Sequence, residues 1–177
     1  LQSLMLAHGF DAVERDGVLA FRMRKGNTPI PLLSEELART AELETTREQV
    51  RAPEAETTGR VRVRFIESGA DHDVVAEEAV LPDEATHAVS SNDLSLAMTR
   101  SEGRQLAERW LAESRLARDS ISLALPPSRM DVGAGDVIAL SGATYRVDRV
   151  EQGEVQTLDA VRIEAAVYEP SEMPEDT

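Results

Sequence analysis

A helical period in the hydrophobic pattern dominates the middle of the chain. Between residues 100 and 118, side chains suited to a core recur at intervals of three and four, which predicts an amphipathic helix. The stripe comprises Leu106, Ala107, Trp110, Leu111, Ser114 and Ala117. Thr99 and Glu102 have the spacing of a capping box, in which each side chain accepts a backbone hydrogen bond from the other residue. Trp110 is the only tryptophan, and we expect it to anchor this helix against a sheet.

Alternation at every second position predicts strands on both sides of the helix. At 60–66 the apolar residues point to one face and the arginines to the other, as in a half-buried strand. Weaker patterns predict strands at 74–81 and 94–98, the second after a polar stretch. After the helix, we expect a strand at 121–125 stopped by Pro126-Pro127, because proline donates no ladder hydrogen bond.

Three strands with short connections follow and imply an antiparallel meander. A turn with two glycines leads into the first, the second occupies 144–150, and the third is a long strand at 158–168. Its inner row would be Val161, Ile163, Ala165 and Val167. The predicted fold class is α+β, mainly antiparallel β, with a barrel-like module around one amphipathic helix.

The first part of the chain predicts a smaller module over residues 1–33. A short helix at 1–8 ends at Gly9, and a hairpin follows with its turn at Asp16-Gly17. Residues 34–59 are acidic and their apolar positions do not align, so we expect a linker with at most a helical turn capped by Ser34. The main domain then spans 60–169, followed by an acidic tail at 170–177. This tail and the absence of an initiator methionine lead us to expect a segment of a longer polypeptide.

Composition limits the partners. The formal net charge of −14 disfavours binding of free nucleic acid, because such affinity comes mainly from Lys and Arg on phosphates. No apolar run approaches the ~20 residues of a membrane span. The chain has no cysteine, which excludes disulfides, thiolate metal sites and a cysteine nucleophile.

Several residues are candidates for chemistry, each with a simpler structural explanation. The row Arg60, Arg62 and Arg64 is able to bind phosphate, but cross-strand pairing with acids explains it better in so acidic a chain. Asp71-His72-Asp73 offers three possible metal ligands, yet adjacent strand residues alternate in direction, which favours a solvated turn.

Isolated histidines and paired glutamates give no better case for catalysis. His8 and His87 have no nucleophile motif nearby, and the neighbours Glu35-Glu36 and Glu77-Glu78 do not face each other in a helix or strand. The sequence G-A-G-D at 133–136 lacks the spacing of a nucleotide fingerprint and predicts a turn into a strand. We therefore expect no catalytic, cofactor-binding or metal-binding residues and no cofactor.

From residue 60 onward the chain resembles the tail-tip and baseplate hub proteins of phage-like particles, above all the large multidomain tail protein of gene transfer agents and related prophages. The resemblance lies in R-V-R-V-R-F-I-E, in A-E-R-W-L-A-E-S-R-L-A-R-D, and in the order L-P-P-S, G-D-V-I and Y-R-V. The segment L-M-L-A-H-G-F-D-A-V-E-R-D-G-V-L-A-F is similar to the helix and hairpin before the barrel in such hubs.

The resemblance implies a structural role without enzymatic activity. Its partners would be other tail and baseplate proteins, with a homo-oligomeric ring in the intact particle, assembled in the bacterial cytoplasm. Membrane spans and specific nucleic-acid binding are not expected. The alternative is a cell-wall-degrading or carbohydrate-binding tail-tip domain, but the scarcity of Trp and Tyr for sugar stacking argues against the second.

Overall fold

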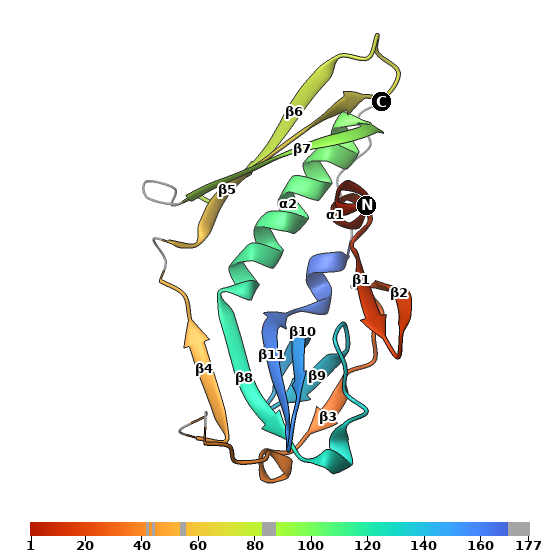
Figure 1. Cartoon of the computed structure of the whole chain (residues 1–177). Coiled ribbons are helices and arrows are strands. Elements are labelled where there is room, and N and C mark those ends of the chain that lie inside the picture. The colour runs from red at the N-terminus through yellow and green to blue at the C-terminus, as the bar shows by residue number, and fades with distance from the viewer. Residues whose placement is uncertain (42, 44, 54–55, 83–87, 170–177) are drawn as a thin grey trace. The chain divides into compact units, whose positions relative to one another are not determined.

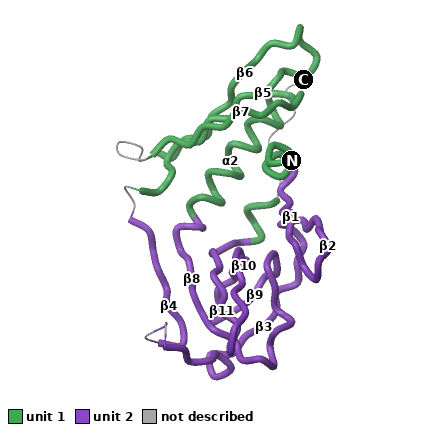
Figure 2. The backbone as a smooth tube through the Cα atoms, in the orientation of Figure 1, with its two compact units in different colours: residues 1–7, 54–115, 165–177 green, residues 8–53, 116–164 purple. Residues whose placement is uncertain are grey.

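The computed structural model describes residues 1–41, 43, 45–53, 56–82 and 88–169 (Figure 1). In this part of the chain strands predominate and α-helices are confined to two segments, so the fold is α+β as predicted. The chain forms two compact units, each built from segments distant in sequence (Figure 2). Unit 1 contains residues 1–7, 54–115 and 165–177, and unit 2 contains 8–53 and 116–164. The predicted segments 1–33, 34–59, 60–169 and 170–177 stay a prediction.

Unit 1 packs helix α2 against one face of a three-stranded sheet. The strands are β5 (Thr58–Glu67), β6 (Val74–Val80) and β7 (Ala88–Met98), in the order β6-β5-β7, and α2 is Arg100–Ala117. Strand β6 is antiparallel to β5, whereas β7 is parallel to it. Helix α1 (Gln2–His8) and the 3-10 helix η4 (Ala165–Tyr168) lie at the two ends of the described chain.

The core of unit 1 confirms the two periodicities. Val61, Val63 and Phe65 are almost fully buried, and they pack with Leu106 and other residues of α2. Trp110 is half-buried and packs against this same core, as expected of the anchor. The burial of these side chains is the main source of stability of the unit.

The capping box at the start of α2 is also present. The backbone N–H of Thr99 donates to Oε2 of Glu102 at 2.7 Å, and the N–H of Glu102 donates to Oγ1 of Thr99 at 3.2 Å. Two backbone donors at the start of the helix are thereby satisfied.

Replacing Thr99 with alanine should lower the free energy of unfolding by about 1 kcal/mol, because the N–H of Glu102 loses its acceptor. Thr99→Ser keeps a hydroxyl at the same place and should remain within about 0.5 kcal/mol of wild type. Urea denaturation of the three proteins measures both values. Equal stability of the alanine and serine variants would contradict a capping role.

Unit 2 contains a two-stranded ribbon and a six-stranded sheet. The ribbon pairs β1 (Phe10–Arg15) with β2 (Val18–Met23). The sheet has the order β3-β9-β10-β11-β8-β4 and is antiparallel except between β3 and β9. Its strands are β3 (Ile30–Leu32), β4 (Arg47–Arg51), β8 (Asp119–Leu125), β9 (Val137–Leu140), β10 (Ala143–Gln152) and β11 (Gln156–Ile163). Leu123, Leu125, Ile138 and Leu158 form the centre of its core.

The predicted meander β9-β10-β11 is confirmed, but the predicted barrel is not. Strands β3 and β4 form the two edges of an open sheet, and no pairing joins them in the described part of the chain. Strand β3 is only three residues long and contains Pro31, which lacks a backbone donor. The 3-10 helix η1 (Ser34–Glu36) follows β3, and a second, η3 (Pro127–Arg129), follows β8.

Three strand predictions were wrong in their extent. The expected linker contains β4, which pairs with β8 through its backbone although its side chains are half-buried or exposed and show no alternation. Strand β7 begins at Ala88, before the predicted position, because β5 supplies a parallel ladder to its polar half. Strand β11 ends at Ile163, because its last pairing partner in β10 is Thr144, so Ala165 and Val167 lie in η4 instead.

Candidate assembly surfaces

The arginine row of β5 lies on the face of the three-stranded sheet opposite α2. Glu78 of β6 lies 3.7 Å from Arg60 and 3.4 Å from Arg62, and Asp93 of β7 lies 3.2 Å from Arg64. The arginines therefore pair across strands with acids, as the simpler explanation predicted. This arrangement lacks the extended positive surface that phosphate binding requires.

An acidic side chain on the other face of the same sheet connects it to α2. The carboxylate of Glu77 is almost buried and lies 3.6 Å from Arg100 and 3.4 Å from Arg104, both in the first half of α2. Arg100 also donates to Glu67 at 2.7 Å, and this hydrogen bond is the main cause that raises the pKa of Arg100 above its ordinary value. Glu77 and Glu78 thus point to opposite faces, as expected of strand neighbours.

The G-A-G-D segment forms the predicted turn, and its aspartate has a role that the sequence analysis missed. Asp136 is buried and accepts a hydrogen bond from the N–H of Gly133 at 2.8 Å. Its carboxylate also binds Arg15 at 3.0 Å and Arg22, from the two strands of the ribbon. A short acid directly after a Gly-rich turn is a signal for such a bond, but its partners are more than a hundred residues away.

The ribbon β1–β2 has its charged face turned toward the rest of unit 2 and its apolar face turned to solvent. Val13 and Arg22 share the inner face and lie next to Gly135. On the outer face, Leu19 is 57% exposed, Phe21 59% and Met23 45%. This distribution is the reverse of an ordinary surface ribbon, whose apolar side chains face the core.

The remaining sequence candidates do not come together as a site. Asp71, His72 and Asp73 are exposed in or beside a turn, and no group of three possible metal ligands occurs among the described residues. His8 is exposed at the end of α1, and His87 lies outside the described residues. Glu36 accepts a hydrogen bond from Arg129 and is not opposite another acid in that contact.

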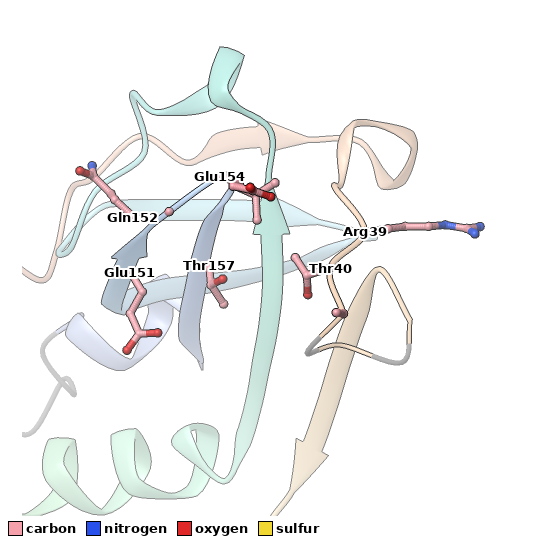
Figure 3. Close-up of a pocket in the computed structure, with 9 residues that line it drawn as sticks. Arg39, Thr40, Glu151, Gln152, Glu154 and Thr157 are labelled. Carbon is pink, nitrogen blue, oxygen red and sulfur yellow. The ribbon is translucent and has the colours of Figure 1, made fainter.

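An open pocket of about 440 Å³ lies in unit 2 beside the β10–β11 turn (Figure 3). Its lining combines Arg39, Thr40 and Ala41 with Thr157 and residues 151–155. Figure 3 shows the side chain of Arg39 extending away from the other labelled side chains, and those of Glu151 and Glu154 pointing in different directions. Glu151 is paired with Arg149. This arrangement does not support the converging carboxylates that glycoside cleavage uses.

Within the described residues, neither α-helix has the length and apolar character that a membrane crossing demands.

Comparison with solved structures relates the whole chain to tail proteins. A chain in "Virion of native gene transfer agent (GTA) particle" is 47% identical, with a TM-score of 0.92 over 99% of this chain and 40% of that chain. The 43 kDa tail protein of prophage MuSo2 from Shewanella oneidensis has a TM-score of 0.57 and 6% identity over 95% of this chain and 54% of that one. The tail protein from Neisseria meningitidis MC58 has 0.52 and 14% over 89% and 52%.

The last two likenesses show a shared fold alone, because their sequences are so different. The present chain spans well under two thirds of each of these three structures. No curated protein matches the chain in sequence. A family model described as "Putative phage tail protein" matches residues 1–150, which is most of the chain. The chain therefore belongs to this phage tail protein family.

Proposed function

We propose that the chain is a structural hub module at the tail tip or baseplate of a phage-like particle, of the prophage or gene transfer agent type. The observation that carries this proposal is the 47% identity over 99% of the chain to a component of a gene transfer agent virion. At that identity and TM-score, the two chains share side chains as well as backbone. The role is assembly with other tail proteins and requires no catalysis.

The strand edges support assembly of copies into a ring. In the described residues, β6 and β7 each have a ladder partner on one side only, so each presents backbone donors and acceptors along its outer edge. Edges of this kind accept a strand from another chain. In unit 2, β3 contains Pro31 and β4 carries exposed charged side chains, features that discourage edge pairing. The edges of unit 1 are therefore the better contacts for a ring.

The proposal is tested by locating the protein in purified particles. An epitope tag inserted at the exposed turn at Gly69, in the full-length protein, should be labelled by antibody at the end of the tail tube farthest from the head. Labelling along the tube, or no labelling of particles that contain the tag on immunoblots after detergent treatment, would contradict a hub position. The same tag on the head protein provides the control for antibody access.

Enzymatic activity is tested separately. The purified chain, with and without added Zn²⁺, should release no soluble fragments from peptidoglycan, whereas lysozyme in the same assay should. Release above the level of a heat-denatured sample would support the cell-wall-degrading alternative instead.

A further inference from the structure

The outer face of the β1–β2 ribbon is the most apolar exposed feature that a described strand pair presents as one continuous surface. Leu19, Phe21 and Met23 alternate along β2, and Phe10 of β1 contacts Phe21 with a ring-centroid distance of 5.8 Å in an edge-to-face arrangement. Residues at these positions belong to one side of the pleat. We define this apolar face by Phe10, Leu19, Phe21 and Met23.

The ribbon cannot turn this face inward without breaking several ion pairs. On its inner side, Arg15 and Arg22 bind Asp136, and Asp11 accepts from Arg24 at 2.7 Å and lies 3.8 Å from Arg146. Asp11, Asp136 and Arg146 are all largely shielded from solvent. Charge pairs in such surroundings are costly to separate, because each partner is left without compensation. The apolar face is therefore held outward.

The size and charge of the chain indicate what covers this face. Its three most exposed side chains offer apolar area on the order of 300 Å², whereas a stable two-protein interface needs about 800 Å² on each side. A dimer built on this face alone would be too small. A second copy would also bring another net charge of −14, which disfavours self-association.

The rim of the face is acidic. Glu14 is exposed on the same side of the ribbon, directly across from Leu19, and Asp16 is exposed at the turn. These carboxylates favour a partner that carries Lys or Arg beside its apolar residues, since opposite charges at a rim determine orientation and partner choice. We propose that the apolar face binds a different tail protein of the same particle, through an apolar segment flanked by basic residues. This inference rests on the proposed function.

Site-specific photocrosslinking in assembled particles tests the inference. Phe21 in the full-length protein is replaced by p-benzoylphenylalanine in cells that produce the particle, and Val89 of β7, which is 62% exposed, serves as the matched control position. Position 21 should crosslink to a different tail protein, at a peptide with apolar residues next to Lys or Arg, and position 89 should not yield that product. A crosslink to a second copy, or to another segment of the same chain, would overturn the inference.

A pair of variants provides an independent measurement. Leu19→Ser with Phe21→Ser should leave the unfolding midpoint of the purified protein unchanged, because both side chains are exposed. The same double variant should lower its incorporation into particles on the order of tenfold, and Glu14→Lys should weaken the crosslink from position 21. Val74→Ser with Val89→Ser is the control, because these side chains are 60% and 62% exposed.

The two proposals fail in different ways. Absence of the protein from particles overturns the proposed function. Normal incorporation of the Leu19→Ser, Phe21→Ser variant together with no crosslink from position 21 overturns the inference alone.

Discussion

Replacing Gly103 with alanine is expected to lower the free energy of unfolding by about 2 kcal/mol, although alanine is the better helix former. Gly103 is buried in the first turns of α2, where it faces Phe65 of β5. A Cβ atom added there would overlap two carbon atoms of the Phe65 ring and lie 3.1 Å from a third. Phe65 is only 1% exposed, so its ring has little room to move. Overpacking therefore outweighs the gain of about 1 kcal/mol in helix propensity.

The measurement is urea denaturation, with Gly153→Ala as the matched control. An added Cβ at Gly153 would meet only a carbonyl oxygen at 3.7 Å, which is ordinary contact. That variant should stay within about 0.5 kcal/mol of wild type. Phe65→Leu removes part of the obstructing ring, so the double variant Gly103→Ala, Phe65→Leu should be more stable than the sum of the single effects predicts. Strict additivity would show that the two residues are not in conflict.

Replacing Asp136 with alanine is expected to cost about 2 kcal/mol and to loosen the β1–β2 ribbon. The substitution leaves Arg15 and Arg22 without their shared acid and the N–H of Gly133 without its acceptor. Loss of one partner of a fully buried pair costs about 3–5 kcal/mol. The side chains of the two arginines are 35% and 39% exposed, so water compensates part of that loss.

Limited trypsin digestion measures the second part of this expectation, because the released arginines are cleavage sites. The Asp136→Ala variant should be cut after Arg15 and Arg22 several-fold faster than wild type. Asp148→Ala is the control, since Asp148 is 45% exposed and pairs with Arg146 on the surface. It should change neither cleavage nor stability by a measurable amount. Equal cleavage of both variants would contradict a role of Asp136 in holding the ribbon.

The local patterns carried the elements of unit 1. The three- and four-residue spacing in α2 and the two-residue alternation in β5 arise from the geometry of each element and need no distant partner. The capping box is equally local, because Thr99 and Glu102 are three residues apart. The family followed from motif order in the same region, and the match over residues 1–150 agrees with it.

Pairing between distant segments was not available from these patterns. Strand β4 shows no alternation, because it is an edge strand whose order comes from its ladder with β8, some seventy residues later. The parallel partner of β7 and the end of β11 depend likewise on where other strands begin and end.

The sequence by itself determined which segments are helical or extended, that the chain is acidic and lacks cysteine, and to which kind of protein it is similar. Only the tertiary structure decided that Gly103 faces Phe65, that Asp136 binds two arginines of the ribbon, and that the apolar side of the ribbon is exposed. The physical reason is the same in each case. A side chain's period along its own element is local information, whereas the atoms it meets belong to segments whose distance in sequence carries no trace of their contact.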